Sequence, residues 1–218
     1  MTRIKICGIT TLRDALVCIE AGVHALGFNF SSESPRAVSP DKAHEIIRKL
    51  PPFVTAIGVF VEQSPDEVCQ ISQHTGLHAA QLHSERYGAT ETLAVITQIP
   101  VIKVFRTGPD FSVTEVLEYK RQTGVHHFLF DAYRPGQAGG TGERIKIETA
   151  KAIFSSTSAT GPSILAGGLK PDNIEEAIRT LRPYAVDTAS GVELAPGQKD
   201  PARIQAFTAA VRRADTMA

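Results

Sequence analysis

Short runs rich in β-branched residues alternate with stretches of helical periodicity along this whole sequence, and the alternation limits the folds open to it. Between the runs, apolar residues recur at helical spacing, as in Leu12, Ala15 and Ile19, so each stretch would present one apolar face. The runs are mostly continuous in apolar residues, which is typical of strands that helices cover on both faces. The eight runs that we expect to be strands are Arg3–Cys7, Ala25–Phe30, Val54–Phe60, Ala79–His83, Pro100–Arg106, His126–Asp131, Ser163–Ala166 and Ala185–Ala189.

Eight strand–helix repeats in 218 residues predict a closed (β/α)8 TIM barrel, slightly shorter than the usual length of about 250 residues. An open, doubly wound parallel sheet is the alternative α/β fold. No linker, repeat or low-complexity tract divides the chain, so we expect residues 1–218 to form a single domain. The active site of such a barrel lies at the carboxyl ends of its strands, and residues in those positions are the candidates for chemistry.

Helix-start signals agree with this interpretation. Thr11 and Asp14, and likewise Ser64 and Glu67, have the spacing of a capping box, in which a hydroxyl and a carboxylate satisfy free backbone N–H groups. Proline fits the first position of a helix because it loses no hydrogen bond there. The prolines that we expect at first helical positions are Pro40, Pro65, Pro171 and Pro201.

The charge balance excludes one class of partner. Lys plus Arg and Asp plus Glu both number 23, so the net charge is zero and the sequence has no basic excess that would favour binding to nucleic acid.

No apolar stretch approaches the roughly 20 residues that a membrane span needs, so we expect no membrane association. The N-terminal residues read as a strand rather than a secretory signal, and a cytoplasmic location is expected.

The three cysteines, Cys7, Cys18 and Cys69, suggest neither a disulfide framework nor a metal site, because their number is odd and their spacing is not that of metal ligands. Cys18 and Cys69 fall on predicted helices, where we assign them to packing. Cys7 ends the first predicted strand and Asp131 ends the sixth, so both side chains can point into a barrel mouth. A thiolate can remove a proton and a carboxylic acid can supply one, so the two residues could act as base and acid. The alternative interpretations are a buried packing residue for Cys7 and a helix cap or turn residue for Asp131.

Two glycine-containing loops predict a phosphate site. Gly167 and Gly168 follow the seventh predicted strand, and Ser190 and Gly191 follow the eighth. In TIM barrels these two loops often hold a phosphate with backbone N–H groups, and glycine lets the backbone approach closely. Ordinary strand-to-helix turns are the alternative, but two such loops at the expected strands favour a phosphate site.

A third glycine cluster, Gly139–Gly142, has the composition of a lid that could close over a substrate.

Three further side chains could contact a substrate. Arg36 follows the second predicted strand and could bind a carboxylate through its planar guanidinium, although a solvated arginine is the more common case. His83 ends the fourth predicted strand. Asp187 lies within the eighth, where a buried carboxylate needs a hydrogen-bonding partner or a substrate hydroxyl.

These residues lie in motifs that resemble the phosphoribosylanthranilate isomerase family of tryptophan biosynthesis, and the resemblance spans almost the whole chain. The opening Cys-Gly-Ile-Thr combined with the closing Ser-Gly-Val-Glu is specific. The matching segments include 5–10 (KICGIT), 26–30 (LGFNF), 34–36 (SPR), 81–83 (QLH), 130–132 (FDA), 139–142 (GGTG), 165–169 (LAGGL) and 187–193 (DTASGVE).

The resemblance implies a (β/α)8 barrel that catalyses the Amadori rearrangement of N-(5-phosphoribosyl)anthranilate to 1-(2-carboxyphenylamino)-1-deoxyribulose 5-phosphate. It implies that Asp131 is the general acid at the ribose ring oxygen and Cys7 the general base at ribose C2. Arg36 matches the residue that pairs with the anthranilate carboxylate, and His83 and Asp187 match residues that line the pocket. The substrate nitrogen serves as the electron sink, so no cofactor and no metal are implied.

The sequence departs from the family pattern at three places: Ser84 replaces a common glycine, Ala37 replaces an aromatic residue, and 143–147 (ERIKI) replaces a Phe-Asp-Trp segment.

The alternative enzymes are other phosphate-binding barrels, such as a sugar-phosphate epimerase or isomerase or indole-glycerol-phosphate synthase. Lys5 and Lys103 lie within predicted strands, so a reaction that uses a catalytic lysine stays open. A catalytically silent phosphosugar-binding barrel is the alternative outside enzymes. The expected partner is a small phosphorylated aminosugar, and the protein is expected to be a monomer or a homodimer.

Overall fold

The structure is a computed structural model that describes residues 1–108, 111–132, 150–151, 153–155 and 161–216. The expected lid, Gly139–Gly142, and the departure at 143–147 lie outside the described residues.

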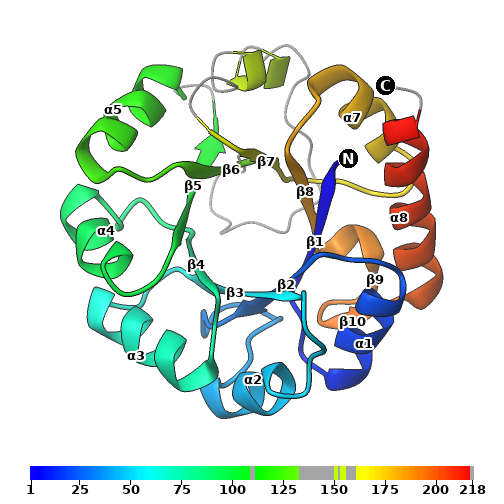
Figure 1. The fold of residues 1–218 in the computed structure, drawn as a ribbon, viewed down its shortest axis with the longest axis horizontal. Coiled ribbons are helices and arrows are strands. Elements are labelled where there is room, and N and C mark those ends of the chain that lie inside the picture. Colours follow the sequence, from blue (N-terminus) through cyan, green and yellow to red (C-terminus); the bar gives the residue numbers. More distant parts are fainter. Residues whose placement is uncertain (109–110, 133–149, 152, 156–160, 217–218) are drawn as a thin grey trace.

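Eight parallel strands form a closed barrel in which each strand pairs with the next along the chain and β1 pairs with β8 (Figure 1). The closed (β/α)8 barrel predicted from the sequence is confirmed, and the open sheet is wrong. Each strand lies within two residues of its predicted bounds. The strands are β1 Arg3–Cys7, β2 Ala25–Asn29, β3 Thr55–Phe60, β4 Ala79–Leu82, β5 Val101–Thr107, β6 His127–Ala132, β7 Ser163–Leu165 and β8 Ala185–Thr188.

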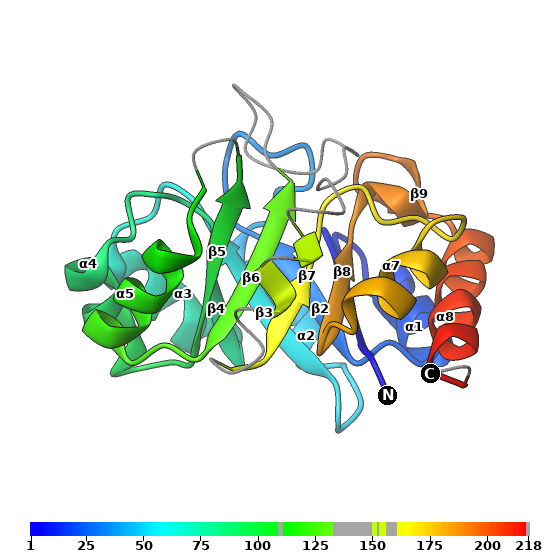
Figure 2. The same cartoon turned by 90° about the horizontal axis from the view of Figure 1, so that it is seen from above.

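Helices surround the barrel in chain order, and the side view shows them packed around the outside of the strands (Figures 1 and 2). Between β6 and β7, the described residues 150, 151 and 153–155 are helical. The helices that have defined bounds are α1 Leu12–Glu20, α2 Pro40–Ile47, α3 Pro65–Thr75, α4 Ala89–Ile96, α5 Val113–Thr123, α7 Ile174–Leu181 and α8 Pro201–Thr216. None of the helices in these described ranges is long and apolar enough to cross a membrane.

The helix starts follow the predicted chemistry with one exception. Thr11 accepts a hydrogen bond from the Asp14 N–H, and Ser64 and Glu67 form a complete capping box. Prolines 40, 65 and 201 each begin a helix, but Pro171 does not, because α7 begins three residues later. The intervening residues form a turn in which the Asn173 side chain accepts from the Lys170 N–H and donates to the Gly168 carbonyl. These bonds delay the helix and hold the loop after β7.

The apolar core has two parts. One fills the barrel interior and includes Ile57, Ile102, Val104 and Leu129. The larger part lies between the strands and the helices, where alternate residues of the same strands point outward. This division explains the continuous apolar runs, because both faces of each strand are buried.

A short hairpin that the sequence did not predict follows β8. The chain makes one 3-10 turn over Ser190–Val192, then β9 (Glu193–Ala195) pairs with β10 (Gln198–Lys199) as an antiparallel sheet before α8 begins. The hairpin carries a buried carboxylate and a buried ammonium, those of Glu193 and Lys199.

Candidate active site

A cavity of about 510 Å³ lies at the carboxyl ends of the strands and gathers residues from most of the barrel. Every predicted site residue except Gly191 lines it. The lining residues among those predictions are Cys7, Arg36, His83, Asp131, Gly167, Gly168, Asp187 and Ser190. The barrel therefore brings together residues that are up to 183 positions apart, as Cys7 and Ser190 are.

Cys7 ends β1 at the wall of this cavity. Burial raises the pKa of its thiol, whereas the nearby ammonium groups of Lys5 and Lys199 act in the opposite direction. Lys199 also donates a hydrogen bond to the Cys7 carbonyl. The net effect is a thiol pKa above its ordinary value, because burial outweighs the two ammonium groups and the Asp187 carboxylate acts in the same direction as burial.

Asp131 is a buried residue near the carboxyl end of β6, and its carboxylate lies 3.5 Å from Nε2 of His83. Burial and three neighbouring cations lower the pKa of His83 to about 3. The imidazole is therefore neutral at ordinary pH, and its buried Nε2 makes no hydrogen bond in the part of the chain that the structure describes. A neutral imidazole in this position can accept or donate one hydrogen bond to a ligand.

Asp187 of β8 is ion-paired with Lys5 of β1, with 2.9 Å between Nζ and Oδ2. Both side chains are almost completely buried. The second carboxylate oxygen, Oδ1, is buried without a hydrogen bond among the described residues, and Asp187 lines the cavity. That oxygen is available to a ligand hydroxyl, because a buried acceptor without a partner destabilises the free protein.

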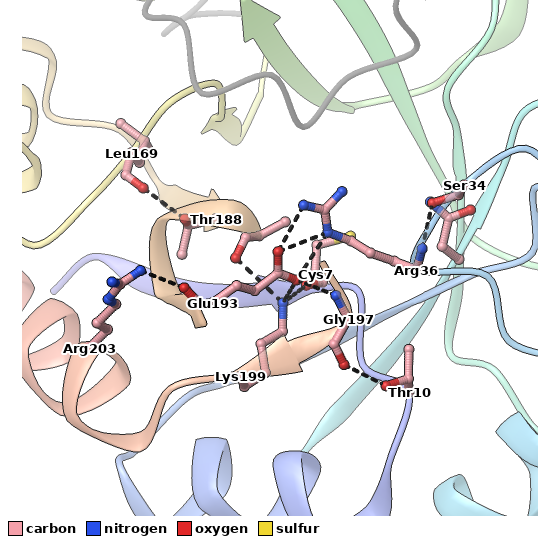
Figure 3. Close-up of polar contacts among 12 residues, drawn as sticks. Cys7, Thr10, Ser34, Arg36, Leu169, Thr188, Glu193, Gly197, Lys199 and Arg203 are labelled. Carbon is pink, nitrogen blue, oxygen red and sulfur yellow. Dashed lines mark hydrogen bonds and ion pairs between the residues drawn. The ribbon is translucent and has the colours of Figure 1, made fainter. Parts of the chain in front are cut away.

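Arg36 binds a carboxylate, but the carboxylate is that of Glu193 (Figure 3). Its Nε and Nη2 donate to the two Glu193 oxygens over 2.8 to 3.1 Å, and Lys199 donates to Oε1 over 2.8 Å. Burial alone would raise the pKa of Glu193, but the two cations hold it below its ordinary value. The third guanidinium nitrogen, Nη1, makes no hydrogen bond within the described ranges, and Arg36 lines the cavity.

The two predicted phosphate loops contact each other. Gly167 and Gly168 have positive φ angles of 89° and 62°, which explains the use of glycine at both positions. A Cβ on Gly191 would lie 1.9 Å from the carbonyl oxygen of Leu169, so glycine is required for the close approach of the loops. Thr188 also donates to that carbonyl over 2.8 Å (Figure 3). The arrangement presents backbone from both loops at one side of the cavity.

Comparison with known proteins agrees with this geometry. A family model described as N-(5'phosphoribosyl)anthranilate (PRA) isomerase matches residues 4–210. The chain belongs to this family. The N-(5'-phosphoribosyl)anthranilate isomerase of Prosthecochloris aestuarii is 59% identical over 215 residues, which are 99% of this chain and 96% of that protein. The isomerase of Chlorobaculum parvum is 55% identical over 217 residues and covers 100% of this chain and 98% of its own.

Solved structures of the phosphoribosylanthranilate isomerase family have the same barrel. The enzyme of Thermus thermophilus superimposes with a TM-score of 0.85 at 38% identity, over 97% of this chain and 99% of its own. A second family structure, a complex with reduced 1-(o-carboxyphenylamino)-1-deoxyribulose 5-phosphate, has a TM-score of 0.84 at 34% identity, over 98% of this chain and 100% of its own. The protein described here is accordingly an isomerase, and the resemblance stated from its motifs is confirmed.

Two charged residues of the site, Glu193 and Lys199, were not predicted as site residues from the sequence, and Lys5 was considered only as a possible catalytic lysine. All three are buried, and each interacts directly with a predicted site residue. One sequence signal could have identified Lys5 as part of a buried ion pair: it is a charged residue within an apolar run, between Ile4 and Ile6, and a buried charge needs a partner.

The Glu193 cluster predicts a pH-dependent loss of stability. Glu193→Gln leaves Arg36 and Lys199 without their shared anion, so we expect a loss on the order of 3 kcal/mol in the free energy of unfolding at pH 7. Because the pKa of Glu193 is lower in the folded protein, its contribution is present above the unfolded value of about 4.5 and is lost as the pH falls through the folded value.

The measurement is urea unfolding of both proteins between pH 3 and 7, with Glu45→Gln, on an exposed helical ion pair, as the control. A gap between wild type and Glu193→Gln that stays constant down to pH 3 would contradict the assignment.

The environment of His83 predicts that its ring remains neutral. With a pKa of about 3, its imidazole resonances should not titrate between pH 5 and 8 in an NMR experiment on the folded protein. The urea-unfolded chain provides the control, since there the same ring should titrate near its unperturbed value of about 6.5. Appearance of an imidazolium between pH 6 and 7 in the folded state would show that Asp131 holds the charged form instead.

Proposed function

We propose that this protein catalyses the Amadori rearrangement of N-(5-phosphoribosyl)anthranilate in tryptophan biosynthesis, with Asp131 as general acid and Cys7 as general base. The observation that carries the proposal is that both side chains line one cavity together with the two glycine loops. A similar solved structure is a complex with a reduced 5-phosphate compound that also carries a carboxyphenylamino group. Such a ligand has an end for the loops and an end for Arg36.

The first proposed step is opening of the ribose ring. Asp131 donates its proton to the ring oxygen as the bond from that oxygen to C1 breaks, and the lone pair of the anthranilate nitrogen forms the new double bond to C1. The product is an open-chain cationic Schiff base. General acid catalysis fits this step because the departing oxygen would otherwise leave as an unstable alkoxide.

The second proposed step is removal of the C2 proton. The iminium acidifies this C–H, so a thiolate is a strong enough base. Cys7 takes the proton, the C–H electrons form the C1–C2 double bond, and the nitrogen recovers its lone pair. The resulting enolamine tautomerises to the ketone by gaining a proton at C1 and losing one from the C2 hydroxyl, so substrate and product are isomers.

We propose that the remaining site residues bind the substrate. The loops around Gly167, Gly168, Ser190 and Gly191 would bind the phosphate through backbone N–H groups. Arg36 would use its free Nη1 edge for the anthranilate carboxylate while Glu193 fixes the orientation of the guanidinium. His83 and Asp187 would bind ribose hydroxyls, because each has a buried polar atom that lacks a partner in the described residues.

Another sugar-phosphate reaction is the alternative function. A solved structure of native KDPGal shares the barrel with a TM-score of 0.72 at 16% identity, which shows only that the fold is common to different proteins. Lysine chemistry is disfavoured by the lysine positions. Lys5 is paired with Asp187, and Lys103 donates to the carbonyls of Ser84 and Tyr87 beside a different cavity.

We further propose that the protein acts in the cytoplasm as one domain, as a monomer or a homodimer. One structurally similar protein, the phosphoribosylanthranilate isomerase of Thermotoga maritima, is described as dimeric. A phosphosugar-binding protein without activity would fail to complement a tryptophan auxotroph that lacks this step, and complementation would exclude that alternative.

Cys7→Ala and Asp131→Asn should each lose turnover by about 10² to 10⁴-fold while keeping the fold, because each removes one acid–base group. The assay is the loss of fluorescence of phosphoribosylanthranilate that is generated in place. Cys69→Ala, which removes a half-buried thiol on α3, is the matched control and should retain the wild-type rate. Near-wild-type turnover by either active-site variant would refute its assignment.

Arg36→Lys should chiefly raise KM, by roughly tenfold or more, because lysine keeps the charge but loses the planar pair of donors. The same assay at varied substrate concentration measures it, and Arg121→Lys, on an exposed helical ion pair, is the control. If KM is unchanged in Arg36→Lys, Arg36 does not bind the substrate carboxylate.

A further inference from the structure

The ammonium of Lys5 lies beneath the cavity, next to the proposed base. Lys5 and Cys7 are two residues apart on β1, so their side chains point to the same face of the strand. Only 3% of Lys5 is exposed, and its Nζ lies 2.9 Å from Asp187 Oδ2. The pairing of β1 with β8 places Lys5 directly opposite Asp187, so the ion pair follows from closure of the barrel.

Gly27 on the neighbouring strand brings the ammonium and the thiol together. Gly27 is the register partner of Cys7 in the pairing of β1 with β2. A Cβ on Gly27 would lie 2.8 Å from Cys7 Sγ and 3.0 Å from Lys5 Nζ. Sulfur and nitrogen therefore both lie against the one bare position of β2, where any larger residue would separate or displace them.

The charges that face Cys7 come from several elements. Lys5 lies beside it on β1, Asp187 on β8, and Lys199 of β10 binds its carbonyl. The Arg36 guanidinium also acts on the thiol, and Asp131 and His83 line the same cavity. Among the groups that favour the thiolate, Lys5 acts most strongly, whereas the Asp187 carboxylate disfavours the thiolate.

Lys5 keeps its charge in this buried place. Burial alone would lower the pKa of Lys5, but Asp187 and Cys7 raise it above the ordinary value. Asp187 contributes more to this rise than Cys7 does, and its carboxylate is ion-paired with the Lys5 ammonium.

We propose that Lys5 is a positioning residue for Cys7: its ammonium holds the sulfur anion in place when the Cys7 proton leaves, and Asp187 balances the same ammonium when the thiol is protonated. The inference rests on the proposed function of Cys7 as base. It explains why an apolar strand carries a charged residue two positions before the thiol. It also assigns Gly27 a role, which is to leave space for both groups.

The test is the pH dependence of Cys7 alkylation by iodoacetamide. The protein carries Cys18→Ala and Cys69→Ala, so that Cys7 is the one thiol that remains of the three in the sequence. Only the thiolate reacts, so the midpoint of the rate against pH reports the thiol pKa. Lys5→Met should raise this midpoint by about one unit or more, which is roughly tenfold slower alkylation at pH 7. Lys5→Arg, which keeps the charge, should restore most of the rate, and a merely structural lysine would not give this pattern.

Lys103→Met is the matched control, because Lys103 is also a buried strand lysine but borders a different cavity. It should leave the midpoint unchanged. If circular dichroism shows that Lys5→Met does not fold, the double variant Lys5→Met, Asp187→Asn removes both charges of the ion pair. Its midpoint should still lie above that of wild type, but by less than is expected for Lys5→Met alone, because Lys5 acts on the thiol more strongly than Asp187 does. A midpoint that stays at the wild-type value in the folded Lys5 variant would overturn the inference.

Failure of the inference can be distinguished from failure of the proposed function. Alkylation requires only a reactive thiol, whereas turnover requires the base. Normal turnover by Cys7→Ala together with a raised alkylation midpoint in Lys5→Met would refute the base but keep the Lys5–Cys7 coupling. A dead Cys7→Ala together with an unshifted midpoint would keep the base and refute the role of Lys5.

Discussion

The pairing of β1 with β8 is the constraint on which the site depends. It closes the barrel, and its register places the Lys5 ammonium opposite the Asp187 carboxylate. A buried ion pair of this kind gives little net stability, because the cost of removing two charges from water offsets their attraction. Its value here is positional: the first and last strands of the barrel bring one lysine, one aspartate and the Cys7 thiol to a single point beneath the cavity.

A second set of charges fixes the rim of the same cavity. Glu193, on the hairpin after β8, binds both Arg36 from the loop after β2 and Lys199, and Lys199 in turn binds the carbonyl of Cys7 (Figure 3). The loop that would hold the phosphate and the arginine that would hold a carboxylate are therefore linked through one buried carboxylate. Rigid support of this kind keeps the ends of a ligand in fixed positions, which the proposed acid and base on β6 and β1 would require.

The sequence predicted the barrel well because parallel strands buried on both faces contain continuous apolar runs, such as 56–60 and 128–130, and glycine loops follow several of them. Eight of the nine site residues proposed from the sequence line the cavity, because position at or near a strand end is a local property. The pairing of Arg36 with Glu193 was not predictable from spacing, since 157 positions separate them and a second long-range contact, from Lys199, completes the cluster. Pro171 was misplaced because a side-chain amide two residues later holds a turn where a helix start was expected.

The central claim is that Cys7 and Asp131 act on one substrate molecule from different walls of the cavity. A crystal structure of this protein with the reduced 1-(o-carboxyphenylamino)-1-deoxyribulose 5-phosphate bound tests the claim most directly, since that compound mimics the open-chain product. The account predicts Sγ of Cys7 in contact with C2, the Asp131 carboxyl in hydrogen-bonding contact with the oxygen at C4, and the phosphate at Gly168 and Gly191. A bound analogue that leaves either Cys7 or Asp131 out of contact would contradict it.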